Sequence, residues 1–378
     1  MGEAQVTQRT NSRSVRVVFL WAEVSGYMAA CWRALALQPG VEVHVVHPER
    51  LWGKSNPFLQ VPDLLSGVSN EMFSCQEPDL DGWLREHVAR RDPDIVVMCG
   101  WFFGPYNRLV TSGHLGKARV ILGMDSPWRG TWKQRLTRLR IRRLVQRVDL
   151  VVTTGERSWE YARRAGFPEK RLRFGFYGFD KELFKKARSQ RFKDGYVWPR
   201  RFLFTGRYVA QKDLPTLIAA YSAYRKSVDS PWELTCCGSG DDETVISGVE
   251  GVTDAGFTPP QRLPEVFAEH GVFILPSRFE PWGVVIAEAC ASGLPVICTT
   301  ACGAGMDLIR PCYNGLLVTP SDVSSLTAAM KWMHDHESAL PIMGQRGVAM
   351  ADAYSAEIWA VRWGHYFEEL LTGVIERP

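Results

Sequence analysis

The feature that most limits how this chain can fold is an alternation of short apolar runs with helical patterns, which continues through both halves of its 378 residues. Buried, β-branched runs separated by helices favour parallel sheets whose crossover helices cover both faces. A single domain usually holds about 100 to 200 residues, so a chain of this length is expected to divide in two. The sequence therefore predicts an α/β protein of two doubly wound, Rossmann-like domains that face each other across a cleft.

Strands are predicted wherever an apolar, β-branched run ends at a turn signal. The runs expected as strands are 15–21, 41–47, 94–99, 119–123, 149–154 and 171–176 in the first half, and 201–206, 233–238, 271–275, 294–299 and 315–319 in the second. Ligands of such sheets bind outside the carboxyl ends of the strands, so site residues are expected in the loops that follow these runs.

The domain limits follow from changes in composition. Residues 1–14 are polar and lack the apolar core of a signal peptide, so a disordered tail is expected there. The run 179–200 is polar and charged and is expected to link a first domain, 15–178, to a second, 201–354. A last amphipathic helix is predicted within 355–378, beginning at a capping serine.

One stretch, 284–306, is apolar enough to suggest a membrane span. Glu288, Gly293 and Pro295 interrupt it, and a charge at the centre of a bilayer is costly. The stretch is therefore interpreted as a helix followed by a buried strand.

Composition narrows the compartment and the class of partner. Nine cysteines lie scattered, mostly in apolar runs, with no C-x-x-C pair and no spacing that suits zinc. Reduced thiols in a cytoplasmic protein are expected, with no metal site. The net charge of +4 is modest, and no nucleic-acid partner is expected.

Basic residues are nevertheless concentrated in the segment 129–147, which has eight cations and no acid. On a helix, Trp132, Leu136 and Leu139 would share one face, and Ile141 would fall nearly opposite. A helix packed on its own sheet with solvated arginines is the favoured interpretation, and contact with an anionic membrane surface is the alternative.

Two carboxylates and a glycine follow the predicted strand 271–275. Glu280 lies in the loop "PSRFEPWG", and Gly283 is expected to open a helix whose unpaired N–H groups would suit a phosphate. Glu288 falls within that apolar helix, where a carboxylate needs partners such as two adjacent sugar hydroxyls. The alternatives are that Glu288 pairs with a cation in the core and that Glu280 is a solvated loop acid.

Two cations follow the first strand of the second half, in "FTGRYVAQKDLP". Arg207 and Lys212 stand between that strand and the next predicted helix, where together they would neutralise a diphosphate. Surface loops also carry such residues without a ligand, so the pair alone does not define a site.

Taken in order, these motifs resemble the retaining glycosyltransferases of family four, which have the GT-B fold. The resemblance rests on G-R-x4-K at 206–212, G-x-G at 238–240, E-x7-E at 280–288, and the runs "EACASGLPVICT" and "NGLLV". It is strong over the second half and looser over the first. It implies that the first domain holds the acceptor, that the second binds a nucleotide sugar, and that the last helix crosses back to the first domain.

The resemblance also implies roles for individual residues. Arg207 and Lys212 match the cations that hold the donor diphosphate. Glu280 matches the acid that touches the transferred sugar, and Glu288 matches the acid that grips the ribose. Further donor contacts, through the backbone or beside the base, are implied for Trp282, Gly283, Val284, Val285, Gly256 and Phe257.

Two positions in the first domain have alternative interpretations. Gly26 matches a glycine loop near the donor phosphates, and an ordinary strand-to-helix turn is the alternative. The family usually has a histidine near the acceptor, whereas this chain has Met124 followed by Asp125. Asp125 is expected either to contact the acceptor or to cap a helix.

The reaction that the resemblance implies is retaining transfer of a hexose from a nucleoside diphosphate sugar to a hydroxyl acceptor, as in polysaccharide biosynthesis. The acceptor is a glycan, a lipid-linked molecule or a small molecule; UDP is favoured over GDP in the donor, and no metal or cofactor is required. Because the family often uses membrane-borne acceptors, an anionic membrane on the cytoplasmic side becomes a candidate partner of 129–147. The rival functions are a GT-B sugar-nucleotide epimerase and a non-catalytic nucleotide-binding module.

Overall fold

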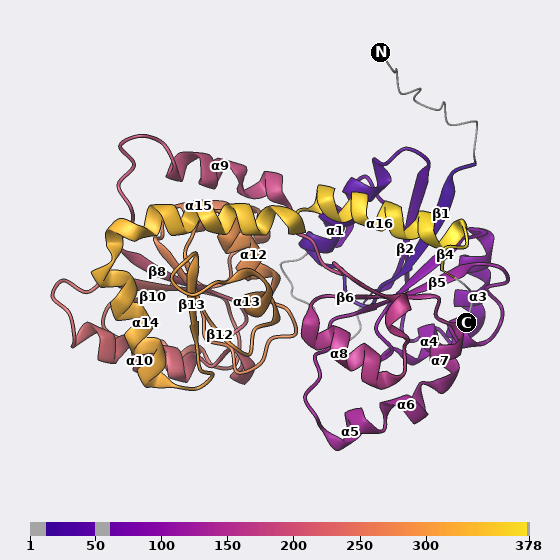
Figure 1. Ribbon diagram of the computed structural model, residues 1–378, viewed down its shortest axis with the longest axis horizontal. Helices are drawn as coiled ribbons and strands as arrows, with labels where there is room; N and C mark the ends of the chain where they lie inside the picture. The colour runs from indigo at the N-terminus through magenta and orange to yellow at the C-terminus, as the bar shows by residue number, and fades with distance from the viewer. Residues whose placement is uncertain (1–12, 50–60, 376–378) are drawn as a thin grey trace, which may run out of the picture.

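The computed structural model describes residues 13–49 and 61–375, which form two α/β halves lying side by side (Figure 1). Residues 1–12 of the tail predicted to be disordered lie outside these ranges. Each half is built on one parallel sheet, so the predicted pair of doubly wound sheets is confirmed.

The first sheet has seven strands in the described chain, in the order β3-β2-β1-β4-β5-β6-β7, and its ladders are parallel. Its strands are β1 (Val15–Leu20), β2 (Val41–Pro48), β3 (Ser69–Phe73), β4 (Ile95–Cys99), β5 (Arg119–Met124), β6 (Leu150–Thr153) and β7 (Leu172–Phe174). The winding direction reverses between β1 and β4, which is where ligands bind in such sheets.

The second sheet has six described strands, in the order β10-β9-β8-β11-β12-β13, and is also parallel. Its strands are β8 (Arg201–Thr205), β9 (Glu233–Cys237), β10 (Val252–Asp254), β11 (Val272–Leu275), β12 (Val296–Thr299) and β13 (Gly315–Val318). Here the winding reverses between β8 and β11.

Helices cover both faces of the sheets. In β1, Val17 and Phe19 belong to one buried cluster, whereas Val18 and Leu20 belong to another, because successive side chains point to opposite faces. The helices of the first half are α1 (Gly26–Ala36), α2 (Val61–Leu64), α3 (Leu80–Arg90), α4 (Gly104–Thr111), α5 (Trp132–Arg135), α6 (Thr137–Arg140), α7 (Arg142–Arg147) and α8 (Glu156–Ala165). Those that follow are α9 (Lys181–Arg191), α10 (Leu214–Arg225), α11 (Leu263–Ala268), α12 (Val284–Ala291), α13 (Gly303–Leu308), α14 (Val323–Asp335), α15 (Leu340–Ala351) and α16 (Ala356–Leu371).

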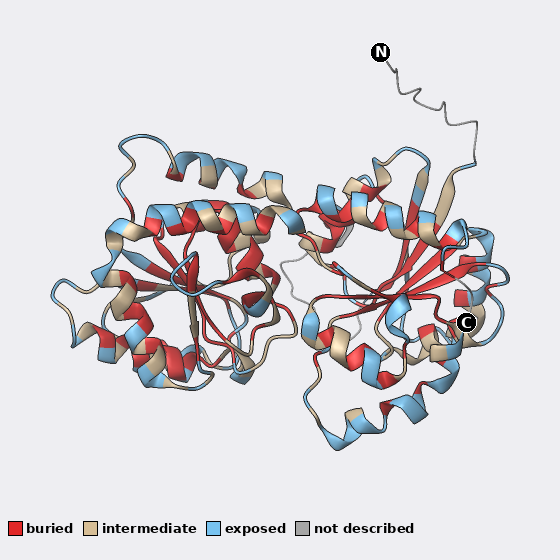
Figure 2. Ribbon diagram, in the orientation of Figure 1, coloured by how far each residue is buried: buried red, intermediate tan, exposed pale blue. Residues whose placement is uncertain are grey.

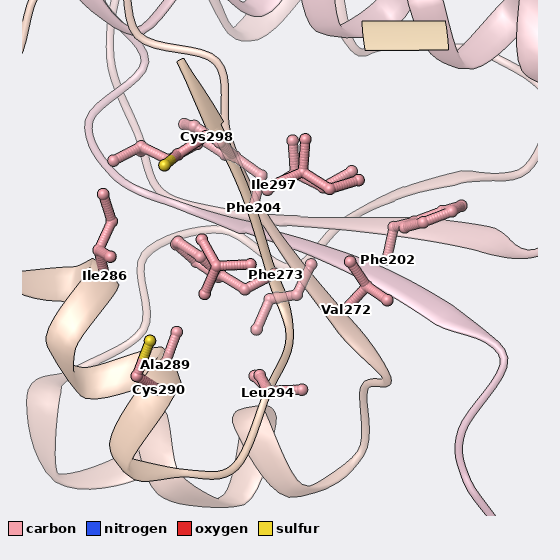
Figure 3. Packing of buried hydrophobic residues seen from close by; sticks show 14 of the residues in the cluster. Phe202, Phe204, Val272, Phe273, Ile286, Ala289, Cys290, Leu294, Ile297 and Cys298 are labelled. Atoms are coloured by element: carbon pink, nitrogen blue, oxygen red, sulfur yellow. The ribbon is translucent and has the colours of Figure 1, made fainter. Parts of the chain in front are cut away.

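The apolar stretch 284–306 contains helix α12 and strand β12, as predicted. Ile286, Ala289 and Cys290 of α12 lie against the apolar side chains of the sheet (Figure 3). Figure 2 shows that the strands of both sheets are mostly buried. Within the described ranges, no helix combines the length and the apolar character that crossing a membrane requires.

The sequence did not predict β3 or β10. Both are edge strands, and each stands first in the strand order of its sheet. β3 reads "SNEMF" and β10 reads "VTD", and most of their residues are exposed or only partly buried. With most of their residues outside the core, these two strands lack the apolar run by which buried strands are recognised.

The last helix, α16, lies on the first half, while α15 lies on the second (Figure 1). Trp359 and Trp363 of α16 are fully buried and their rings lie within 6.4 Å of the Phe19 ring of β1, measured between centroids. Where the chain passes to α16, Phe179 and Ser355 form a parallel bridge. Both passages between the halves therefore run side by side.

Candidate active site

The two motif loops of the second half follow β8 and β11, the neighbouring strands at which the winding reverses. β8 leads to Arg207 and Lys212, and β11 leads to Glu280. The N–H of Arg278 donates to the carbonyl of Gln211 at 2.9 Å, which joins the loops directly. The sequence motifs are thus brought together at the carboxyl ends of the strands.

Lys212 and Glu280 form an ion pair, with Nζ 2.5 Å from Oε2. Their side chains are only 12% and 13% exposed, and Ser277 Oγ donates to the same carboxylate oxygen at 3.4 Å. The sequence assigned the two residues separate roles and did not predict their contact. Because an ammonium group has three N–H donors, Lys212 can orient Glu280 and still donate to a phosphate oxygen.

Arg207 lies in the same loop as Lys212, after β8. Its side chain is exposed and makes no ion pair with any residue in the described ranges. The neighbouring Tyr208 is buried, and its Oη donates to Asp254 Oδ1 at 2.8 Å. A fixed loop therefore leaves the Arg207 guanidinium available to an anion.

Gly283 precedes α12 with a φ of 92°, in the left-handed region that glycine adopts without strain. No described side chain caps this helix, so the first N–H groups, at Val284 and Val285, remain open. The loop before the helix is fixed by a backbone hydrogen bond, which the N–H of Ala304 donates to the Trp282 carbonyl at 2.7 Å. An open helix start on a fixed loop is suited to binding a phosphate.

Glu288 lies five residues after Gly283, on the same helix, and is partly buried. Its carboxylate forms no hydrogen bond or ion pair with any residue that the structure describes. The alternative interpretation, an ion pair with a cation in the core, is therefore not observed among these residues. Burial raises the pKa of Glu288 to about 7, and the negative charge of Asp180 adds to the effect. Such a carboxylate needs hydrogen-bond donors, which a ligand can supply.

Gly256 follows β10 and completes the edge next to the Arg207 loop. Its N–H donates to Asp254 Oδ1 at 2.9 Å, and its carbonyl accepts from Gly238 N at 2.8 Å. A Cβ on Gly238 would lie 1.9 Å from the Gly206 carbonyl oxygen, so only glycine fits in this G-x-G turn. Phe257 is partly buried beside it.

Gly26 is the first residue of α1, and Ser25 caps that helix by accepting from Met28 N at 3.4 Å. A Cβ on Gly26 would lie 3.9 Å from Pro260 of the second half. The turn after β1 thus has ordinary strand-to-helix geometry and also faces the other half.

Asp125 follows β5, and Tyr177 Oη donates to its Oδ2 at 2.9 Å. Burial raises the pKa of Asp125, and the negative charge of Glu280 contributes in the same direction. The charge of Glu280, from the second half, therefore acts on Asp125 of the first half. The interpretation of Asp125 as a helix cap is wrong, because Thr131 caps the next helix, α5.

Trp282 and Asp307 form a contact that the sequence did not predict. The Trp282 side chain is buried, and Nε1 donates to Asp307 Oδ2 at 3.0 Å. The Asp307 carboxylate lies against Gly155 of the first half, where a Cβ would be 2.3 Å from Oδ2. Burial raises the pKa of Asp307 to about 6. No spacing in the sequence predicts these contacts, or the one from Tyr177, since each joins residues that are well separated along the chain.

Family models match both halves of the chain. A model described as "Glycosyl transferase 4-like domain" matches residues 6–175. A second, described as "Glycosyl transferases group 1", matches residues 199–336, which include both motif loops.

Two curated relatives match part of the chain. An exopolysaccharide phosphotransferase of Streptomyces coelicolor is 30% identical over 162 residues, which are 40% of this chain and 17% of that protein. O-antigen chain mannosyltransferase B of Escherichia coli is 26% identical over 169 residues, which are 43% of this chain and 44% of that protein. The chain therefore matches less than half the length of either relative.

Solved structures resemble the whole chain. A sucrose-phosphate synthase from Thermosynechococcus elongatus has a TM-score of 0.72 at 18% identity, and the match covers 95% of this chain and all of that one. The HepE protein of Anabaena in complex with UDP-glucose has a TM-score of 0.71 at 18% identity, and the match covers 95% and 99% of the two chains. At these identities the likeness establishes the fold alone.

Proposed function

Because the chain belongs to the group 1 glycosyltransferases, the retaining glycosyltransferases of family four with the GT-B fold, we propose that it transfers a hexose from a nucleoside diphosphate sugar to an acceptor hydroxyl with retention of configuration. The observation that carries this proposal is the 2.5 Å pair of Lys212 and Glu280 beside the open start of α12. That arrangement offers a cation and free N–H groups to a diphosphate, and a carboxylate to the adjoining sugar.

The donor is proposed to bind at the carboxyl ends of β8 and β11. The diphosphate would bind to Arg207, to Lys212 and to the N–H groups after Gly283, and the sugar would contact Glu280. The carboxylate of Glu288, which has no partner among the described residues, would accept hydrogen bonds from both ribose hydroxyls.

The base would lie beside Gly256 and Phe257. A UDP-sugar is the proposed donor, which the UDP-glucose complex of the Anabaena HepE protein supports. Gly26 would approach the donor from the first half, since it faces Pro260.

Catalysis would come mainly from charge stabilisation. Negative charge grows on the diphosphate as the glycosidic bond breaks, so the two cations and the helix start would bind the transition state more tightly than the ground state. The donor site supplies this positive charge from Arg207 and Lys212 without a metal ion.

The acceptor side centres on Asp125 in place of the histidine usual in the family. Tyr177 holds one carboxylate oxygen at 2.9 Å, which leaves the other to accept from an acceptor hydroxyl. The acceptor would be a hydroxyl of a glycan, a lipid-linked molecule or a small molecule.

The proposed location is the cytoplasm, at the inner face of a membrane. Seven buried cysteines are unpaired thiols, as expected in a reducing compartment: Cys31, Cys99, Cys236, Cys237, Cys290, Cys298 and Cys302. An anionic membrane is the proposed partner of the segment 129–147.

A panel of nucleotide sugars, screened by thermal shift and then tested for turnover with hydroxyl acceptors, checks the proposal. A sugar nucleotide that stabilises the protein and is consumed only with an acceptor supports transfer. Isomerisation of the donor without acceptor would indicate an epimerase, and binding without turnover on any acceptor would indicate a binding module.

A further inference from the structure

The short helices α5 and α6 expose three large apolar side chains. Trp132 is 65% exposed, Leu136 45% and Leu139 76%. Both helices project at the margin of the first half (Figure 1), and their surface is largely exposed (Figure 2). Residues 129–147 thus contain three short helices. Of the two apolar faces considered from the sequence, the face with Trp132, Leu136 and Leu139 is exposed and the opposite face is buried.

The opposite face of this segment anchors it to the fold. Thr137, Ile141 and Leu144 are buried, and Thr137 Oγ1 lies 2.8 Å from Tyr161 Oη of α8. The exposed side chains are therefore held in place by a packed base. Trp132, Leu136 and Leu139 stay exposed in the described chain, so only a partner outside it could bury them.

Exposed cations surround these apolar side chains. None of them makes an ion pair with any residue in the described ranges: Lys133, Arg135, Arg138, Arg140, Arg142 and Arg143. No acidic residue occurs between Asp125 and Asp149. Like charges gathered without counter-charges repel one another, so this surface complements an anionic partner.

We infer that Trp132, Leu136 and Leu139, with the surrounding cations, dock the protein on an anionic lipid surface. A bilayer suits both parts of this surface, since its headgroups take the cations and its interfacial region takes a tryptophan and two leucines. A nucleic acid would neutralise the cations but would leave the leucines in water. The lipid is therefore the occupant that the chemistry favours.

The docking surface is tied to the candidate active site. Gln134 of α5 accepts from Arg129 N at 2.7 Å and donates to the Pro127 carbonyl at 2.9 Å, in the loop that follows Asp125. The Arg129 guanidinium lies 4.5 Å from the centre of the Phe279 ring, beside Glu280. Resting on the proposed function, this connection assigns the acceptor to the class of molecules anchored in the membrane, with their hydroxyls presented next to the docked helices.

Sedimentation of the full-length protein with vesicles tests this inference. Vesicles of phosphatidylcholine with about 30% phosphatidylglycerol are expected to bind the protein at about 50 mM salt and to release most of it at about 500 mM. Vesicles of phosphatidylcholine alone are expected to bind at least tenfold less.

Two variants separate the apolar and ionic parts of the surface. Combined Trp132→Ala, Leu136→Ala and Leu139→Ala is expected to weaken binding about tenfold or more, and so is combined Arg138→Glu and Arg140→Glu. A matched control replaces three other exposed apolar side chains, Leu37, Val197 and Val374, with alanine and is expected to bind like the wild type.

Either of two results would overturn the inference: no binding of the wild type to anionic vesicles at low salt, or full binding by both surface variants. Preferential binding to a nucleic acid would also overturn it. Nucleotide-sugar thermal shifts, measured on the same variants, are expected to match the wild type. A failure of lipid binding is thereby distinguished from a failure of the proposed function.

Discussion

Trp282 donates a hydrogen bond of 3.0 Å from Nε1 to Oδ2 of Asp307, where that carboxylate meets Gly155 of the other half. The backbone of Trp282 belongs to the loop between Glu280 and α12, which is proposed to hold the donor. The bond therefore fixes this loop from the interface between the halves. Donors fixed in advance need no reorganisation when charge develops on the substrate.

Replacement of Asp307 tests this fixation. Asp307→Ala leaves the buried indole N–H without a partner, at a cost of about 1–3 kcal/mol. We expect kcat/KM for the donor to fall about tenfold, which corresponds to about 1.4 kcal/mol. Asp307→Asn keeps an acceptor oxygen and should restore most of the activity. The control is Asp335→Ala, which removes an exposed aspartate paired with Lys331; wild-type kcat and KM in Asp307→Ala would exclude the positioning role.

The raised pKa of Glu288, about 7, makes donor affinity depend on pH. Only the ionised carboxylate can accept from both ribose hydroxyls, so the donor Kd should rise by up to tenfold per unit as the pH falls below 7. Glu288→Gln should bind the donor weakly and with little pH dependence between pH 6 and 8, as measured by calorimetry. A wild-type Kd that stays constant over that range contradicts the assignment.

The same group predicts a stability effect of opposite sign. The pKa of Glu288 is higher in the folded chain, about 7, than its ordinary value of 4.5, so its contribution is fully present below pH 4.5 and is lost as the pH rises through 7. At pH 8 the ligand-free protein holds a costly charge there. Glu288→Gln should therefore raise the unfolding free energy by about 1–3 kcal/mol at pH 8, and the gain should vanish near pH 4. Denaturant titrations at both pH values would reveal the difference or its absence.

Loss of Lys212 should weaken the donor site twice over. Lys212→Ala removes one cation from the diphosphate and leaves Glu280, which is only 13% exposed, without its 2.5 Å partner. UDP affinity is expected to fall about 10- to 100-fold. The diphosphate loses one cation, and the negative charge of Glu280 is left uncompensated at a little-exposed position. Lys185→Ala, which removes an exposed lysine of α9, should leave UDP binding unchanged. Equal affinities for the two variants would refute the assignment of Lys212.

Tyr177 is expected to act on the acceptor side alone. Tyr177→Phe removes the hydrogen bond that lowers the pKa of Asp125, so that pKa should rise further. If the ionised form serves the acceptor, the acidic limb of the kcat profile should move to higher pH, while the donor Kd stays the same. A pH profile identical to that of the wild type would separate Tyr177 from the reaction.

The central parts of the fold were predictable because burial on both faces makes strands such as β4 and β11 continuously apolar. β3 and β10 were not, because these two edge strands are largely exposed and carry no continuous apolar run. The three helices α5, α6 and α7 were also not distinguishable from one longer helix, because their local patterns run on without a proline or glycine between them.

Within the site, motif residues such as Lys212 and Glu280 could be named from the sequence because each follows a strand in a recognisable spacing. Their ion pair could not, since it depends on β8 and β11 being neighbours in the sheet. Asp307 and Tyr177 carry no local signal. Their significance comes from contacts between separate segments of the folded chain, within the second half for Asp307 and Trp282 and within the first half for Tyr177 and Asp125.

The two passages of chain between the halves meet at Phe179 and Ser355, where Phe179 N donates to the Tyr354 carbonyl at 3.0 Å and Ala356 N donates to the Phe179 carbonyl at 2.8 Å. Two strands of backbone bonded at one point constrain relative motion more than a single tether would. Rotation about an axis through that point stays possible, while sliding and twisting of one half past the other would break the bonds. We therefore expect the halves to open and close by rotation about an axis through this bonded point. The same residues would then face each other again after every closure.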